Sequence, residues 1–128
     1  ARATHRMSEF VAANRERHQA GPVIGVGFSN GANILANILI ENPGLFESAV
    51  LMHPLIPFEP NDRTGKASSR ILITAGERDP ISPVDLTNQL ADYFRRQGDS
   101  VDLEWHPGGH ELRPNEIQAA KTFLAQYR

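Results

Sequence analysis

The hydrophobic and polar positions of the chain alternate between two kinds of pattern. Short apolar runs have the character of buried strands, and they cover residues 22–27, 48–54, 70–76 and 101–107. Longer stretches have the spacing of helices, and they cover residues 4–18, 32–40, 83–98 and 114–128. Apolar strands that alternate with helices are typical of a parallel sheet covered by helices on both faces. We therefore predict a single α/β domain of this architecture over residues 1–128.

Two parts of the pattern make narrower predictions. Residues 55–69 begin apolar and then become polar, with turn-forming Asn61, Asp62 and Gly65, so they predict a long connection. The helix over 114–128 starts at a proline, which suits a first helical turn. The apolar side chains expected on its buried face are Ile117, Ala120, Leu124 and Tyr127.

Polar side chains with catalytic potential follow each predicted strand. Ser29 follows the first strand and His53 ends the second. Asp79 follows the third strand and His110 follows the fourth. In parallel sheets the carboxyl ends of the strands meet at one edge, where reactive groups gather. We therefore expect these four residues to lie at the same edge of the sheet.

Ser29 lies between two glycines in the stretch "GFSNG", at the turn from the first strand into a buried helix. A nucleophile at such a turn, a nucleophile elbow, has a strained backbone that needs small neighbours, here Gly27 and Gly31. The same turn leaves the backbone N–H of Asn30 at the helix amino terminus, where it can donate to an oxyanion. The alternative interpretation is a loop with a pair of glycines and a capping serine.

A serine nucleophile needs a base, and the chain offers five histidines. His110 is favoured because it follows two glycines in "HPGGHEL", which let the backbone bring the imidazole across the sheet edge. His53 is interpreted first as a hydrogen-bonded histidine of the core or pocket. His106 is expected to line the sheet surface, and His5 and His18 are expected to be solvated.

The carboxylate that orients the base is expected on the loop "TAGERDPISP", after the third strand. We favour Asp79 over Glu77, because the following proline fixes the local turn. The alternative for Asp79 is a helix-capping or Asx-turn role. The remaining acids nearby are interpreted as solvated charges, and they are Asp85, Glu104 and Glu111.

Composition narrows the classes of function. The net charge is −2 and the 13 basic residues are scattered, which gives no pattern for nucleic acid or an anionic membrane. The chain has no cysteine, so disulfides and thiolate metal sites are excluded. No apolar run approaches the length of a membrane span, and the first residues lack the apolar segment of a signal peptide. By default we expect a cytoplasmic protein.

Three separated motifs carry a family resemblance: "GFSNGANILANILIENPGLFESAVLMHP", "LITAGERDPISP" and "HPGGHEL". They resemble the carboxylesterase/phospholipase-like branch of the α/β-hydrolases, and especially bacterial hydrolases grouped with hydroquinone-response enzymes. The resemblance implies Ser29 as nucleophile, Asp79 as acid and His110 as base, in the chain order of that superfamily. It also implies that a carboxylic ester is hydrolysed through an acyl-enzyme, without metal or organic cofactor.

The substrate pocket is expected around the apolar segment "LIPF" that follows the second strand. The residues predicted to border the acyl or alcohol group of a small-molecule ester are Phe28, Met52, His53, Leu55 and Ile81.

The resembled family has several strands before the nucleophile strand, and a loop among them supplies the second oxyanion donor. No "HG-x-G"-type loop occurs in the 128 residues. We therefore expect the carboxyl-terminal half of an α/β-hydrolase-like domain, weakly active by itself and prone to association. The alternative is a non-catalytic half-domain that acts as an interaction module. Expected partners are a second copy of the chain or the missing amino-terminal half.

Overall fold

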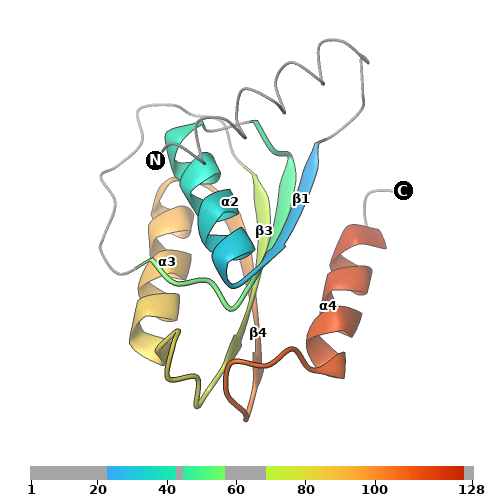
Figure 1. Cartoon of the computed structure of the whole chain (residues 1–128). Helices are drawn as coiled ribbons and strands as arrows, with labels where there is room; N and C mark the ends of the chain where they lie inside the picture. The colour runs from blue at the N-terminus through green and yellow to red at the C-terminus, as the bar shows by residue number, and fades with distance from the viewer. Residues whose placement is uncertain (1–22, 43–44, 57–68, 126–128) are drawn as a thin grey trace.

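The computed structural model describes residues 23–42, 45–56 and 69–125. The predicted helix over 4–18 and most of the predicted connection over 55–69 lie outside the described residues. The elements in chain order are β1 (Ile24–Phe28), α2 (Asn30–Glu41), β2 (Ser48–Met52), β3 (Arg70–Gly76), α3 (Val84–Arg96), β4 (Ser100–His106) and α4 (Pro114–Ala125) (Figure 1). Within the described residues, the predicted strands and helices are confirmed, and their ends lie within two residues of the prediction, except for the end of the last helix, whose predicted residues 126–128 lie outside the described ones.

The strands form a parallel sheet, as predicted, and their order in it is β1-β2-β3-β4. The pairing of β1 with β2 ends at Phe28 opposite Met52. The pairing of β3 with β4 continues to Gly76 opposite His106. The carboxyl ends of all four strands therefore lie at the same edge of the sheet. At this edge β3 and β4 continue beyond the ends of β1 and β2.

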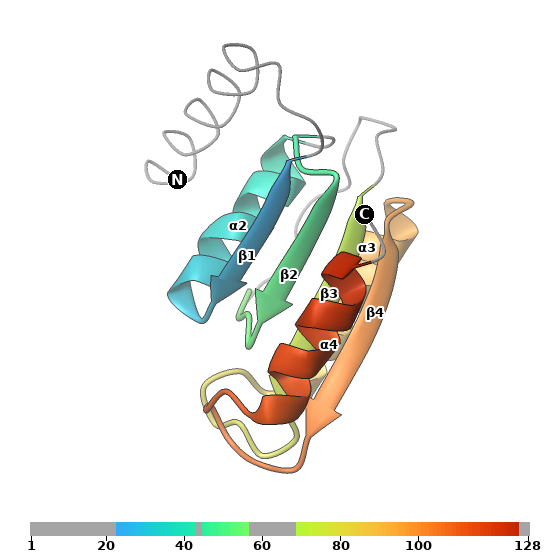
Figure 2. The same ribbon diagram turned by 90° about the vertical axis from the view of Figure 1, so that its right-hand side faces the viewer.

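Helices cover both faces of the sheet, which confirms that part of the prediction. α2 and α3 lie on one face and α4 on the other (Figures 1 and 2). Their buried apolar side chains form two clusters against the two faces, because parallel strands are apolar on both sides. The larger cluster, under α2 and α3, includes Leu35, Ile38, Leu39, Leu51, Ile71, Ile73, Leu90 and Phe94. The smaller cluster, under α4, is formed by Val50, Met52, Leu72, Ala120 and Phe123.

The buried face of α4 differs from the predicted one. Glu116, Ala120 and Phe123 are buried, whereas Ile117 is 39% exposed. The predicted face is therefore shifted by one residue. The physical reason is that the buried Glu116 carboxylate accepts hydrogen bonds from Thr74 of β3 and from the Arg113 N–H, which fixes the rotation of the helix. Tyr127 lies outside the described residues.

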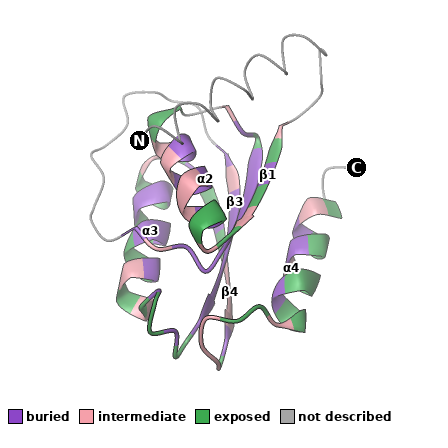
Figure 3. Cartoon of the chain, viewed as in Figure 1, coloured by how far each residue is buried: buried purple, intermediate pink, exposed green. Residues whose placement is uncertain are grey.

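β1 differs on its two sides. Towards α2 it presents glycines, and a Cβ on Gly27 would lie 2.6 Å from the carbonyl carbon of Gly31. The alternate positions Ile24, Val26 and Phe28 face away from α2 and are 41%, 55% and 38% exposed (Figure 3). α4 packs on β3 and β4 and does not cover β1 (Figure 2). Among the described residues, this β1 apolar face is open.

No helix in the described part of the chain is long and apolar enough to cross a membrane.

Candidate active site

Ser29 occupies the turn between β1 and α2 with φ 55° and ψ −113°, a backbone conformation that is strained for any residue except glycine. Its N–H donates to the Met52 carbonyl at 2.9 Å, and its carbonyl accepts from the Asn33 N–H at 3.0 Å. The turn is therefore anchored to β2 on one side and to α2 on the other. Asn30 is the first residue of α2, where backbone N–H groups have no acceptor inside the helix.

The two glycines beside Ser29 are not equivalent. The close approach of α2 requires a glycine at Gly27, since a Cβ there would overlap the backbone of Gly31 and Ala32. At Gly31, a Cβ would meet no described atom within 4 Å. The prediction that the turn at Ser29 tolerates only small neighbours is therefore supported at Gly27, whereas no contact among the described residues requires a glycine at Gly31.

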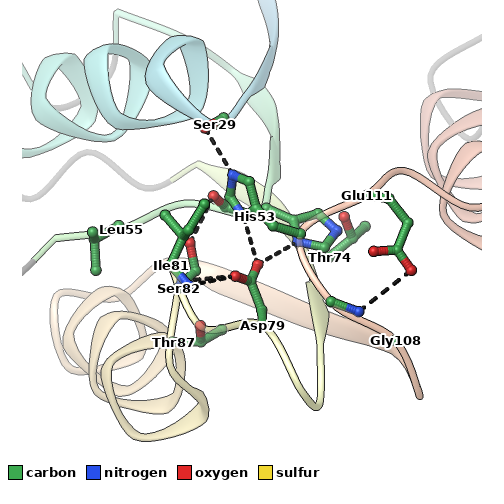
Figure 4. Close-up of polar contacts among 12 residues, drawn as sticks. Ser29, His53, Leu55, Thr74, Asp79, Ile81, Ser82, Thr87, Gly108 and Glu111 are labelled. Atoms are coloured by element: carbon green, nitrogen blue, oxygen red, sulfur yellow. Dashed lines mark hydrogen bonds and ion pairs between the residues drawn. The ribbon is translucent and has the colours of Figure 1, made fainter.

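Ser29, His110 and Asp79 lie in hydrogen-bonding order at the carboxyl edge of the sheet. Figure 4 labels Ser29 and Asp79, and dashed lines mark their hydrogen bonds. Ser29 Oγ is 2.9 Å from His110 Nε2, and His110 Nδ1 is 2.6 Å from Asp79 Oδ2. An ionised carboxylate only accepts, so Nδ1 of His110 carries the proton. In the neutral ring Nε2 is then the acceptor, and the Ser29 hydroxyl donates to it.

His110 reaches this position because its loop lies against the end of β3. The Arg78 N–H donates to the Gly108 carbonyl at 2.9 Å, and a Cβ on Gly76 would lie 2.3 Å from the Gly109 carbonyl oxygen. The contact is therefore possible only with a glycine at the end of β3. The His110 side chain keeps 16% of its surface exposed.

Asp79 is buried and its carboxylate is held on both oxygens. Oδ1 accepts from the N–H groups of Ile81 and Ser82 at 2.8 and 2.9 Å, which is the Asx-turn arrangement named above as an alternative. Oδ2 accepts from two imidazoles, those of His53 and His110. Burial raises the pKa of Asp79, but the donors outweigh it and lower the pKa to about 2. Glu77, the competing acid, is exposed.

The predicted pocket residues are spread around this centre. The Phe28 ring packs beside the His53 and His110 rings, with centroids 5.7 and 5.5 Å apart. Met52 is buried in the cluster under α4, and Ile81 is 53% exposed. The Leu55 N–H donates to Asn33 Oδ1 at 2.6 Å. Their contacts with a substrate stay a prediction.

A buried polar network lies behind Asp79. His53 Nδ1 is 2.8 Å from Asp79 Oδ2, and its Nε2 is 2.8 Å from Glu116 Oε2. The second pair is at hydrogen-bond distance but not at a hydrogen-bond angle. The Thr74 hydroxyl donates to Glu116 Oε2 at 2.5 Å, and His106 Nε2 is 3.0 Å from Glu116 Oε1. His53, with no exposed surface, therefore matches its first interpretation as a hydrogen-bonded core histidine.

Glu116 and Thr74 were not singled out from the sequence. Glu116 is the third residue of α4, where a glutamate is ordinarily a capping residue in water, and it does accept from the Arg113 N–H at 3.0 Å. The one feature of the sequence that indicates its burial is the helical spacing, because positions 116, 120 and 123 lie on the same face of a helix. Thr74 lies inside a strand whose other residues are mostly apolar, and nothing in its pattern marks it.

Some of these side chains could in principle hold a cation. Two groups of side chains have ligand atoms within 4.8 Å of one another. The first group is His53, His106 and Glu116, and the second is His53, Asp79 and His110. Their nitrogen–oxygen distances of 2.8, 3.0 and 2.6 Å are those of hydrogen bonds. Two ligands of a tetrahedral zinc ion would lie about 3.3 Å apart. The nitrogen–oxygen distances in the two groups are therefore shorter than zinc ligation requires, and the expectation of no metal or cofactor stays a prediction.

One protein family and several known proteins are similar to this chain. The sequence pattern of the dienelactone hydrolase family matches residues 2–116. The chain is 34% identical over 125 residues to the putative hydrolase MhqD of Bacillus subtilis (strain 168), covering 96% of this chain and 62% of that protein. It is similar to the crystal structure of Atu2452, a protein of unknown function from Agrobacterium tumefaciens, with 63% identity and a TM-score of 0.94 over 99% of this chain and 62% of that one. A Bacillus cereus carboxylesterase is 27% identical, with a TM-score of 0.87 over 96% of this chain and 59% of that one.

The chain thus spans about three fifths of the length of these relatives.

Proposed function

The chain belongs to the dienelactone hydrolase family and has the α/β-hydrolase fold, and from that premise we propose that it carries the triad of a serine hydrolase that cleaves a carboxylic ester. Membership supports a hydrolase of the esterase-like kind. We further propose that Ser29 is the nucleophile, that an acyl-enzyme forms, and that the substrate is a carboxylic ester. The observation that carries it is the pair of distances from His110, 2.9 Å to Ser29 Oγ and 2.6 Å to Asp79 Oδ2, at a strained turn.

In the first half of the reaction, Ser29 Oγ attacks the carbonyl carbon and its proton passes to His110 Nε2. The tetrahedral oxyanion accepts from the Asn30 N–H at the amino end of α2, where the helix dipole favours negative charge. His110 then gives the proton to the leaving alcohol, and the acyl group stays on Ser29. Asp79 holds the ring in the tautomer that this requires.

In the second half, a water molecule attacks the acyl carbon while His110 takes one of its protons. The carbon–Oγ bond breaks, the proton returns to Ser29, and the carboxylic acid leaves. A second oxyanion donor is expected from a segment outside the described residues, since one N–H alone stabilises the oxyanion less. Losing one such donor raises the barrier by about 3 to 4 kcal/mol.

The decisive experiment uses the full-length form, meaning this chain extended at its amino end to the length of its relatives. A fluorophosphonate should label Ser29, and Ser29→Ala should abolish both labelling and hydrolysis of a short-chain nitrophenyl ester. Asp79→Asn should lower kcat by about 10⁴-fold, because the histidine tautomer is no longer fixed. Full hydrolysis by the Ser29→Ala protein would refute the assignment.

A second candidate function, a non-catalytic interaction module, is favoured by the β1 apolar face. An apolar groove of about 310 Å³ also lies beside β1 and α2, between Val26, Ile34 and Phe46. Open apolar surfaces and strand edges invite pairing with another chain or with a missing part of the domain. If the chain is an interaction module, we expect the 128-residue chain to self-associate and Val26→Lys to weaken this association. We then also expect the full-length form to have no esterase activity. Size-exclusion chromatography and esterase assays of both forms separate the two candidates.

The remaining expectations concern partners and location. A small-molecule ester is the proposed substrate. A cytoplasmic location and a homo-oligomer stay predictions.

A further inference from the structure

His53 is a buried residue that the proposed reaction does not use. It follows β2, its backbone φ is 53°, and its side chain has no exposed surface. A non-glycine residue keeps this left-handed conformation only where its surroundings determine it. The His53 N–H donates to the Thr74 carbonyl at 2.8 Å, and its carbonyl accepts from the Ser82 hydroxyl at 3.2 Å. The backbone is therefore held on both sides, and the ring has one orientation.

This orientation completes the hydrogen bonding of Asp79. A carboxylate has about four lone-pair sites, and here Ile81 and Ser82 occupy the two on Oδ1. On Oδ2, His110 occupies one site and His53 the other. Because every site is filled, the carboxylate cannot rotate without losing a buried hydrogen bond.

Glu116 lies against the nitrogen of His53 that points away from Asp79. The carboxylate of Glu116 already accepts from the Thr74 hydroxyl and from the Arg113 N–H. His106 Nε2 lies 3.0 Å from Glu116 Oε1 and donates to the Glu111 carbonyl at 3.0 Å. It carries the proton of a neutral ring, because His106 Nδ1 accepts from the Gly108 N–H. An unprotonated His53 Nε2 and an ionised carboxylate oxygen 2.8 Å apart would repel each other, so one of the two groups must hold a proton, although the contact is not aligned as a hydrogen bond.

We propose that His53 and Glu116 are a positioning pair: one proton, held on His53 Nε2 or on Glu116, offsets the charge of their close contact, so that His53 keeps the Nδ1–H that donates to the carboxylate that orients His110. This inference rests on the proposed function. Among the described residues, the titratable groups that face His53 are Asp79, Glu116, His106 and His110. His53 touches no reacting atom, so its effect passes through Asp79.

The donation from His53 has a consequence for the pH dependence. It neutralises part of the charge on Asp79, and this leaves less negative charge to stabilise a protonated His110. Removal of the donor strengthens the hold of Asp79 on the His110 proton. The acid limb of the activity profile, where His110 must lose that proton to act as base, then moves to higher pH.

The experiment compares two variants of His53 in the full-length form. The amide of His53→Asn places an N–H near the position of Nδ1, whereas that of His53→Gln places one near Nε2. We expect His53→Gln to move the acid limb of kcat/KM upward by about half a pH unit or more and to lower kcat about tenfold. His53→Asn should restore the acid limb towards its original position. Gln118→Ala, an exposed change on the same helix as Glu116, is the control.

The outcomes separate this inference from the proposed function. If fluorophosphonate does not label Ser29 in the unmodified protein, the proposed function fails, and this inference fails with it. If Ser29 is labelled but both variants shift the profile equally, or neither shifts it, only the positioning pair is overturned. If neither variant folds, ¹⁵N NMR of the histidines in the unmodified protein decides. A protonated Nδ1 on His53 near neutral pH supports the pair, and a bare Nδ1 overturns it.

Discussion

The two imidazoles that donate to Asp79 Oδ2 lie in different surroundings. His110 belongs to a loop, keeps 16% of its side chain exposed and faces the Ser29 hydroxyl. His53 belongs to a strained turn, is fully buried and faces the Glu116 carboxylate. We call these the open side and the buried side of Asp79. The two histidines thus differ in burial and in partners, and this difference is the basis for the two roles that we propose, proton transfer for His110 and positioning for His53.

The largest expected effect comes from removing the imidazole on the open side. His110→Ala should lower kcat by about 10⁵-fold in the full-length form, since a serine without its base is a poor nucleophile. The free energy of unfolding should change by about 1 kcal/mol, because the side chain is partly exposed. Ester hydrolysis and urea denaturation measure the two quantities. A large loss of stability with activity retained would reverse the roles of the two sides.

The buried side should respond mainly in stability. Glu116→Ala removes the buried carboxylate that faces His53 Nε2 and accepts from the Thr74 hydroxyl, and it should cost about 3 to 5 kcal/mol of unfolding free energy. Glu111→Ala is the matched control, because Glu111 pairs with Arg113 on the surface and should cost less than about 1 kcal/mol. Urea titrations of the two variants give the difference. Equal costs would show that the buried side is not a coupled network.

The open side depends on the contact between the end of β3 and the His110 loop. Gly76→Ala places a Cβ 2.3 Å from the Gly109 carbonyl oxygen, so the loop must move. A displacement of about 1 Å should lower kcat by about a hundredfold. Gly31→Ala is the control, since no described atom lies within 4 Å of its Cβ. Steady-state kinetics that find both variants equally active would show that the loop position is not critical.

The smallest effect concerns the carboxylate between the two sides. The pKa of Asp79 is lowered from 3.8 to about 2, because donors on both sides outweigh burial. This group therefore stabilises the folded state fully above about pH 4, and its contribution, on the order of 2 kcal/mol, is lost as the pH falls towards 2. Asp79→Asn should remove this part of the acid dependence. Unfolding free energies between pH 7 and pH 2 test it, and an unchanged dependence in the variant would assign it to other groups.

The sequence contained enough to predict the residues of the open side, but on the buried side it predicted only that His53 is a hydrogen-bonded residue of the core or pocket. Ser29, Asp79 and His110 could be predicted because each follows an apolar strand, and parallel strands bring their carboxyl ends together. Glu116 could not be predicted, because a glutamate in a first helical turn is normally solvated, and its burial depends on the packing of α4 against β3. The same packing explains the shift of the buried face from Ile117 to Glu116. The contacts of His53 with two carboxylates from distant loops likewise arise only in the assembled fold.

The contact between Ser29 and His110 joins residues 81 positions apart in the chain, so it also has a consequence for folding. Contacts of such long sequence separation carry a large loop-closure cost, and they form only after the intervening strands have paired. In a partly folded chain, His110 reaches Ser29 only after β4 has packed onto the sheet. Glu116 reaches His53 only after α4 has packed onto the sheet. Reactivity of Ser29 during refolding should therefore emerge in a single late step, together with the slowest hydrogen-exchange protection of the sheet.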